Sequence, residues 1–155
     1  MILKLRQRMA REESGFTLVE LLVVMLILGL LAAIAIPAFF NQRDKAHDAQ
    51  AKVFDRTAET AMETYATDNG GVYTGANAAA LQGEESTLNG ANISAVTVPA
   101  GGGDTTSKSY KVSVTSSTGN VFSITRHDNG TTALTCTAAG TAGCPGTGGG
   151  TGNWG

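Results

Sequence analysis

The sequence is poor in charge and in the residues that usually bind metals or perform catalysis. Only 15% of its 155 residues are Asp, Glu, Lys or Arg, and it has two histidines, two cysteines and three prolines. It contains no C-x-x-C pair, and its His and Cys residues do not cluster, which argues against a zinc site. It also lacks G-x-S-x-G, the motif of a nucleophile elbow. Because no catalytic constellation is visible, a structural role is favoured over an enzyme.

Basic residues are scarce outside the N-terminus. The first fifteen residues carry four basic and two acidic side chains: Lys4, Arg6, Arg8, Arg11, Glu12 and Glu13. Without this segment, seven basic and eleven acidic groups remain, a net charge of −4. Nucleic-acid-binding proteins gather Lys and Arg into a patch or stripe, so nucleic acid is not expected as a partner.

The sequence does have one long apolar run. Leu21–Ile36 contains no charged or strongly polar side chain. Extended back to Phe16, the run is 21 residues long, about 32 Å as a helix at ~1.5 Å per residue, which suits a bilayer core. The basic flank before it predicts a cytoplasmic N-terminus, with everything after Pro37 exported. We therefore expect a single-pass membrane protein.

One acid, Glu20, lies inside the N-terminal end of this run. A charge in lipid is unfavourable by roughly 2.5–3.5 kcal/mol at the bilayer centre, and by less near the interface. A secretory signal peptide, with an A-x-A-like site at Ala33–Ala35, is one interpretation, but its apolar region is usually only about 7–15 residues long. A plain signal anchor explains the length. Neither interpretation gives Glu20 a role.

The stretch GFTLVE, residues 15–20, resembles the processing motif of the type IV prepilin family, which includes pilins and the pseudopilins of type II secretion. That motif has a Gly, a Phe that becomes N-methylated, and a Glu four residues later at the start of an apolar helix. Gly15, Phe16 and Glu20 occupy these positions, and the basic leader fits as well. Pro37 matches a helix-kinking proline common in the family, so a kink is expected near it. The resemblance covers residues 1 to about 70.

The resemblance implies how the chain is divided and processed. Residues 1–15 would be a cytoplasmic leader, 16–37 a transmembrane and assembly helix, and 38–155 an exported pilin-like unit. A membrane-embedded prepilin peptidase would cut after Gly15 and methylate the new amine of Phe16. When helices of several subunits bundle, Glu20 would pair with the Phe16 amine of a neighbour, because an unpaired buried charge costs about 3–5 kcal/mol. Pairing of these groups within one subunit, at i,i+4, is the alternative.

The same resemblance implies a function and its partners. The chain would be a structural subunit of an extracellular type IV pilus-like filament, with copies of itself and other pilins as partners. Before assembly it would sit in the inner membrane, in contact with lipid, the prepilin peptidase and an assembly platform, and it would need no cofactor. A pseudopilin of a type II secretion or competence system is the alternative. A membrane-anchored enzyme or binding domain is a more distant one.

The exported part predicts an α+β fold, in which a long N-terminal helix packs under a small antiparallel sheet. The helix resumes after Pro37, and Asp68–Gly71 ends it. Its expected inward stripe is Ala46, Ala49, Val53, Ala58, Ala61, Met62 and Tyr65. The expected outward residues are Arg43, Asp44, Asp48, Lys52, Asp55, Arg56, Glu59 and Glu63.

Strand patterns follow the helix. Residues 74–108 form a connection, with a short helix near Asn77–Leu81 and a strand near Ser94–Val98. Ser109–Thr115, Val121–Arg126 and Thr131–Cys136 alternate apolar and polar residues or follow turn signals, and they predict an antiparallel meander. The sheet thus spans about residues 94–136, and its apolar side can cover the helix.

The two cysteines, Cys136 and Cys144, fall in the exported part, where a disulfide is the expected state. It would close a Gly-rich tail, as in pilins; most major pseudopilins instead carry calcium ligands. Four acids are candidates for such a calcium site, although their spacing matches no known loop and no metal is assigned: Glu84, Glu85, Asp104 and Asp128. His47 and His127 are expected to be solvated.

Overall fold

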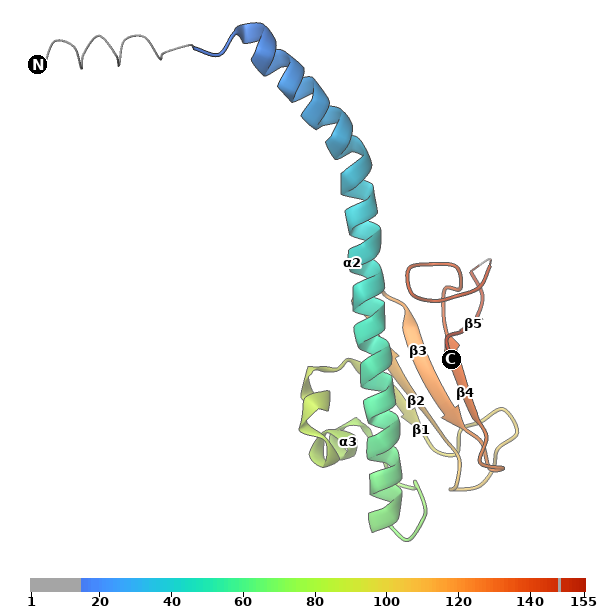
Figure 1. The fold of residues 1–155 in the computed structure, drawn as a ribbon. Helices are drawn as coiled ribbons and strands as arrows, with labels where there is room; N and C mark the ends of the chain where they lie inside the picture. Colours follow the sequence, from blue (N-terminus) through green and yellow to red (C-terminus); the bar gives the residue numbers. More distant parts are fainter. Residues whose placement is uncertain (1–14, 148) are drawn as a thin grey trace, which may run out of the picture. The chain divides into compact units, whose positions relative to one another are not determined.

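A computed structural model describes residues 15–147 and 149–155. In chain order the elements are α2 (Leu18–Asp68), α3 (Ala78–Glu84), the 3₁₀-helix η1 (Ser86–Gly90), β1 (Ile93–Thr97), β2 (Tyr110–Thr115), β3 (Val121–Arg126), β4 (Thr132–Cys136) and β5 (Gly152–Asn153), as Figure 1 shows. The chain divides into two compact units, one ending at Phe40 and the other comprising Asn41–Gly155. Apart from Gly15, the expected leader lies outside the described residues.

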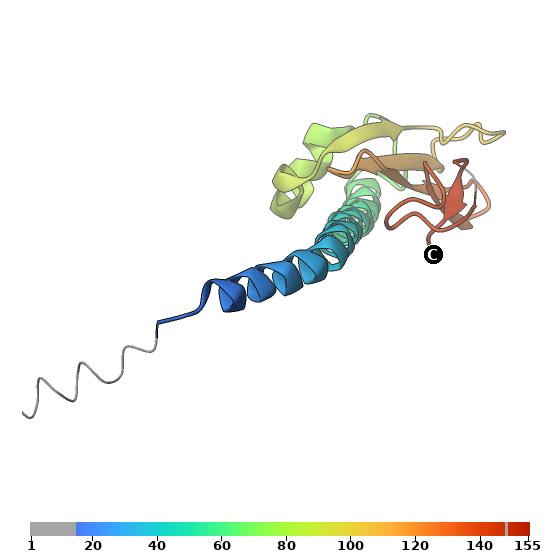
Figure 2. The same cartoon turned by 90° about the horizontal axis from the view of Figure 1, so that it is seen from above.

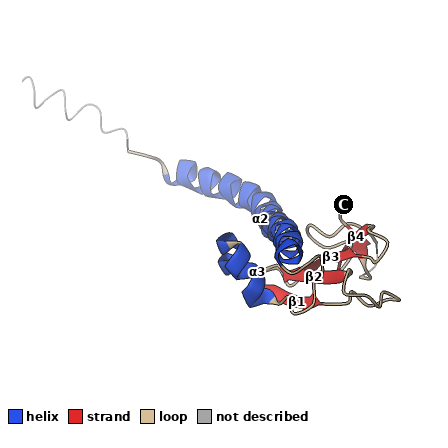
Figure 3. Cartoon of the chain, turned by 90° about the horizontal axis from the view of Figure 1, so that it is seen from below, coloured by secondary structure: helices blue, strands red, loops and turns tan. Residues whose placement is uncertain are grey.

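The second unit is built on one antiparallel sheet. Its strands follow chain order, β1-β2-β3-β4-β5, and every neighbouring pair is antiparallel. The 41–68 part of α2 covers one face of this sheet, and α3 lies beside β1 (Figure 3). The predicted α+β class is confirmed, as are the strands from β1 to β4 and the short helix α3. η1 and β5 were not predicted from the sequence. β5 is two residues long and pairs with β4 at the edge of the sheet, near the C-terminus (Figure 2).

Small residues of α2 let the sheet approach the helix closely. Ala58, Ala61 and Met62 are at most 3% exposed, and they pack with Tyr110 and other buried residues of the main core. Those other residues are Ala66, Tyr73, Leu81, Leu88, Val112 and Ile124. A second cluster joins Ala51 to Val114, Phe122, Ala139 and the two cysteines. Each fully buried large apolar side chain contributes about 1.5–3 kcal/mol of transfer free energy, so these clusters hold the sheet on the helix.

The inward face of α2 differs from the prediction over its first turns beyond Asn41. Asp48, Ala51 and Asp55 are buried, whereas Ala46, Ala49 and Val53 are exposed. The prediction assigned charged residues to solvent and apolar ones to the sheet. That rule fails here because later loops supply hydrogen-bond donors to Asp48, which one helix's periodicity does not reveal. From Ala58 onward, Ala58, Ala61 and Met62 face inward as expected.

The C-terminal end of α2 has a physical cause. At the C-terminal end, Gly70 and Gly71 have positive φ of 70° and 82°. The Gly71 amide donates to the Ala66 carbonyl at 2.7 Å, which closes a left-handed helix cap and confirms the predicted end at Asp68–Gly71. Pro37 lies inside α2, and the kink expected near it stays a prediction.

Candidate processing and assembly site

The cleavage point predicted from the sequence lies in an exposed segment without helical structure. Residues 15–17 precede α2 without helical structure, and Phe16 is 82% exposed. A Cβ added at Gly15 would meet no atom within 4 Å. The residues on both sides of the predicted scissile bond are therefore reachable, and glycine allows the extended backbone that a protease cleft requires.

Glu20 caps its own helix. The Glu20 backbone amide donates to Thr17 Oγ1 at 3.2 Å, while Glu20 Oε2 accepts from the Thr17 amide at 3.2 Å and from its hydroxyl at 3.1 Å. This reciprocal arrangement is a capping box, which satisfies two donors at the start of a helix. This capping box was not predicted, although T-x-x-E at residues 17–20 is its sequence signal. In this uncut chain Glu20 thus has a partner other than the Phe16 amine.

The first half of α2 is apolar on every side. Among the described residues, it is the one helix long and apolar enough to cross a membrane, and its most apolar window is entirely unburied. The exposed large apolar residues before Asn41 are Phe16, Leu18, Val19, Leu21, Leu22, Val23, Val24, Met25, Leu26, Ile27, Leu28, Leu30, Leu31, Ile34, Ile36, Phe39 and Phe40. A helix that is hydrophobic all round is covered by lipid or by other helices, which agrees with a single-pass membrane anchor.

Asp48 ties α2 to two distant loops. Its carboxylate accepts hydrogen bonds from Asn120 Nδ2 at 2.7 Å, from the Gly143 amide at 2.8 Å, and from the Thr118 hydroxyl. Burial alone would raise the pKa of Asp48, but hydrogen bonds from Thr118, Ser116, Asn120 and Gly143 lower it overall. A Cβ added at Gly143 would lie 2.6 Å from the Asp48 Cβ, so this close approach requires glycine.

The predicted disulfide is formed. Cys136 at the end of β4 is bonded to Cys144, with the two Cα atoms 5.8 Å apart. Lys52 Nζ donates to the Gly143 carbonyl at 2.7 Å, and the Gly143 amide donates to Asp48. Two side chains of α2 therefore bind the backbone of the disulfide-closed loop. Trp154 Nε1 donates to the Thr135 carbonyl at 2.8 Å and fixes the end of the tail on β4.

Asp55, two turns beyond Asp48, has no such partner. It is fully buried, and neither of its carboxylate oxygens has a hydrogen-bond partner among the described residues. Burial, reinforced by the nearby Glu59 carboxylate and opposed by Arg56, raises the pKa of Asp55 to about 8. At neutral pH this side chain is therefore mostly a neutral acid, which lowers the energetic penalty of its position.

Glu63 anchors the C-terminal turns of α2. It accepts from the Tyr73 hydroxyl at 2.8 Å, the Tyr110 hydroxyl at 3.2 Å and the Arg126 guanidinium at 3.0 Å. Burial and the hydrogen bond to Glu63 raise the pKa of Tyr73 to about 12. The cluster joins α2 to β2 and β3, and it satisfies two tyrosines whose rings also stack edge to face.

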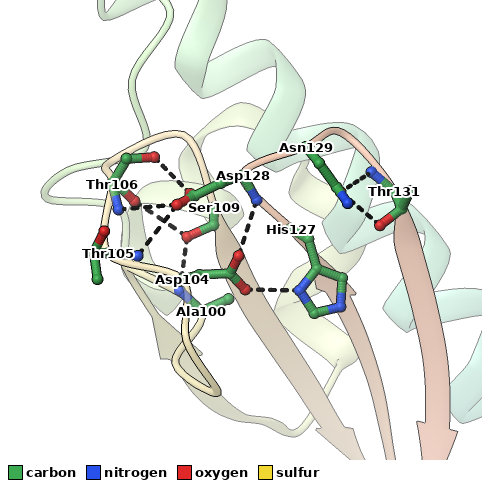
Figure 4. Close-up of polar contacts among 9 residues, drawn as sticks. All are labelled: Ala100, Asp104, Thr105, Thr106, Ser109, His127, Asp128, Asn129 and Thr131. Carbon is green, nitrogen blue, oxygen red and sulfur yellow. Dashed lines mark hydrogen bonds and ion pairs between the residues drawn. The ribbon is translucent and has the colours of Figure 1, made fainter.

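Two of the acids considered as calcium ligands, Asp104 and Asp128, lie in one hydrogen-bonded cluster between two loops (Figure 4). Asp128 accepts from the backbone amides of Thr105 and Thr106 and from the Thr106 hydroxyl. In return, Asp104 contacts His127 Nδ1 at 2.7 Å and accepts from the Asp128 amide at 3.1 Å. Protein groups thus contact both carboxylates, and His127, expected to be solvated, is bonded to Asp104 through its Nδ1. No group of three or more His, Cys, Asp or Glu suited to a metal occurs in the described part of the chain.

The family profile that matches this chain covers its N-terminal segment. Residues 10–36 match the profile of the prokaryotic N-terminal methylation motif. The chain is 41% identical over 59 residues to type II secretion system core protein G of Pseudomonas aeruginosa, which is 38% of this chain and 42% of that protein. It is 38% identical over 90 residues to fimbrial protein EcpC of Eikenella corrodens, 58% of this chain and 57% of that protein.

A third relative is the type IV major pilin protein PilE1 of Neisseria gonorrhoeae, 33% identical over 89 residues, which is 57% of this chain and 41% of that protein. The chain thus spans about 40–57% of the length of the curated relatives it matches. No solved structure matches it. The resemblance to type IV pilins and type II secretion pseudopilins is confirmed over these 59–90 residues.

Proposed function

We propose that this chain is a structural subunit of a type IV pilus-like filament, not an enzyme. The observation that carries the proposal is the GFTLVE stretch, exposed before an all-apolar helix that leads into a disulfide-closed α+β unit. The apolar half would keep the subunit in the inner membrane, with its N-terminus cytoplasmic, until assembly. In the filament the same apolar surface would be covered by the helices of neighbouring copies.

Processing would come first. A prepilin peptidase would cut after Gly15 and methylate the amine of Phe16, and an inner-membrane assembly platform would then extract the subunit. Cleavage releases the charged amine next to the Thr17–Glu20 capping box. In the bundle, Glu20 would pair with the Phe16 amine of a neighbour and set the axial register of the helices, because either charge left alone in an apolar core costs about 3–5 kcal/mol.

A processing variant tests this order of events. Replacing Gly15 with a bulky residue such as Leu should stop cleavage, while the chain still inserts into the membrane. Intact-mass measurement of the membrane fraction should then show the full-length variant and the shortened wild type. Normal cleavage of Gly15→Leu, or loss of the variant from the membrane, would contradict the proposal.

A pseudopilin of a type II secretion or competence system is the second candidate. Similarity to type II secretion system core protein G favours it. The terminal disulfide loop and the longer matches to EcpC and PilE1 favour a pilin. Gene neighbours discriminate between them: a retraction ATPase indicates a pilus, whereas a secretin with exported cargo proteins indicates secretion. Deletion of the gene should remove surface filaments in the first case and protein secretion in the second.

A further inference from the structure

Both sulfurs of the Cys136–Cys144 bond are enclosed by the fold. Cys136 and Cys144 are 1% and 2% exposed, and a Cβ added at Gly152 of β5 would lie 3.1 Å from Cys144 Sγ. A thiol reduces a disulfide when its thiolate attacks one of the two sulfurs. The contacts that hold the segments around these sulfurs in place therefore control how readily the bond is reduced.

The loop between the two cysteines, residues 137–143, is held mainly by polar contacts. One of its residues, Ala139, is buried. The Cys144 amide donates to the Thr141 carbonyl at 2.9 Å, and the Gly140 amide donates to the Cys144 carbonyl at 2.9 Å. Because these two bonds fold the loop back on Cys144, the loop and the Cys144 sulfur move together.

Two side chains of α2 bind the loop at Gly143, the residue before Cys144. The Gly143 amide donates to Asp48 Oδ2 at 2.8 Å, and its carbonyl accepts from Lys52 Nζ at 2.7 Å. Burial raises the pKa of Asp48, but its hydrogen bonds lower it overall, so the carboxylate is ionised at neutral pH. Hydrogen bonds to charged groups are roughly twice as strong as those between neutral groups. Both polar groups of Gly143 are thus held by charge-assisted bonds.

The turn between β2 and β3, residues 116–120, connects the same carboxylate to the loop a second time. Asn120 Nδ2 donates to Asp48 Oδ2 at 2.7 Å, and Asn120 Oδ1 accepts from the Thr141 hydroxyl at 3.2 Å. Asp48 therefore binds the loop directly at Gly143 and through Asn120 at Thr141. Neither the turn nor the loop carries a titratable side chain, so neither segment can replace the negative charge of Asp48.

We propose that Asp48 and Lys52 form a latch on Gly143 that keeps the disulfide closed and protected from reductants. The latch holds Cys144 beside Cys136, and the disulfide in turn holds Gly143 beside α2. By thermodynamic reciprocity, opening either one weakens the other by the same factor. The redox state of the two cysteines thus controls how firmly α2 is bound to the loop. This redox-sensitive switch lies within the second unit and does not depend on the proposed filament function.

Equilibration with dithiothreitol measures the latch. One thiolate of dithiothreitol attacks a protein sulfur and forms a mixed disulfide, and its second thiol then closes the ring of oxidised dithiothreitol. Two electrons and two protons pass to the protein, whose cysteines become two thiols. The full chain in detergent is held at neutral pH with a fixed ratio of reduced to oxidised dithiothreitol. Alkylation followed by intact-mass measurement then gives the ratio of reduced to oxidised protein.

Asp48→Asn should raise that ratio about tenfold, equivalent to about 30 mV, because the Gly143 amide then faces a neutral acceptor. Lys52→Met keeps the apolar stem near the Phe122 ring but removes the donor to the Gly143 carbonyl, and it should raise the ratio about threefold or more. This second variant decides the test if Asp48→Asn does not fold. Asp55→Asn is the matched control, because its carboxylate has no hydrogen-bond partner among the described residues. It should leave the ratio unchanged.

A second measurement distinguishes the latch from general destabilisation. Urea denaturation gives the factor by which a latch variant lowers the folding equilibrium constant, both in the oxidised chain and in a chain with Cys136→Ser and Cys144→Ser. Coupling predicts a smaller factor in the serine chain, by the same fold-change as the redox ratio. The proposal is overturned by an equal factor in both chains or by an unchanged redox ratio in either folded latch variant. An effect of Asp55→Asn as large as theirs would overturn it as well.

Discussion

Two aspartates seven residues apart on α2 face the sheet in opposite electrostatic conditions. Asp48 is surrounded by donors, and its pKa is lowered. Asp55 has no partner among the described residues, and its pKa is raised to about 8. An acid with a lowered pKa stabilises the fold above its ordinary pKa, whereas an acid with a raised pKa destabilises it there. The two side chains should therefore respond to pH in opposite ways.

Asp55→Asn should stabilise the second unit increasingly as pH rises. Unfolded Asp55 loses its proton near pH 3.8, and folded Asp55 keeps it to about pH 8. Between these values the folded state binds the extra proton, so the free energy of unfolding falls as pH rises. The amide and the protonated acid are both buried without a partner, so the gain should be near zero at pH 4 and should grow to about 3–5 kcal/mol at pH 8, at ~1.4 kcal/mol per pKa unit. Urea denaturation of the detergent-solubilised chain at both pH values measures it.

Asp48→Asn is the matched control for that experiment. It should destabilise the unit at neutral pH, because the donors from Asn120 and Gly143 lose a charged acceptor in a buried site. The loss should shrink as pH falls through the folded pKa of Asp48, which lies below 3.8. A gain from Asp55→Asn that does not depend on pH would contradict the account of Asp55.

Glu20 has two candidate roles, and two substitutions separate them. Glu20→Gln removes the charge but keeps a residue type found in capping boxes. Thr17→Ala keeps the charge but breaks the cap, at about 0.5–2 kcal/mol of helix stability. If Glu20 pairs with the Phe16 amine of a neighbour, Glu20→Gln should abolish filament while cleaved subunit stays in the membrane, and Thr17→Ala should retain filament. The comparison is sheared filament against the membrane pool. The reverse pattern would assign Glu20 to capping alone.

At the scale of elements, the disulfide loop should be separable from the core. The Cys136–Cys144 loop is short, so its closure contributes about 2.5 kcal/mol in the chain-entropy model. Reduction should increase hydrogen exchange in β4, β5 and residues 137–155, while β2, β3 and α2 beyond Ala58 keep their protection, because Glu63 and the main core hold them. Equal loss of protection across the whole sheet would show that loop and core unfold together.

The elements that the sequence predicts are those with local signals. β3, Val121–Arg126, matches the prediction at both ends, and Asn77 caps α3 through the Ala80 amide. β5 escapes prediction because Gly152 and Asn153 carry no strand pattern, and pairing with β4 alone makes them a strand. The inward position of Asp48 escapes it too, since its donors come from residues about 70–95 positions later in the chain. The Thr17–Glu20 capping box could have been predicted, because its T-x-x-E signal is local.

At the scale of the whole molecule, the proposed function makes the uncut chain a precursor. The apolar half of α2 is exposed and would need lipid or other helices to cover it. The proposed cut after Gly15 would place a charged amine at the start of this half. Each of these features taken alone would also fit a simple membrane anchor. Under the proposed function, the mature chain should be found in a filament, with a defined first residue and a closed disulfide.

Intact-mass analysis of subunits sheared from the cell surface tests this claim most directly. The account predicts a chain of residues 16–155 that begins at N-methylated Phe16 and lacks the two hydrogens removed by the Cys136–Cys144 bond. A mature chain that begins at Ile36 would instead indicate a secretory signal peptide. An uncut chain, found in the membrane and absent from any sheared filament, would contradict the account and leave a plain membrane anchor.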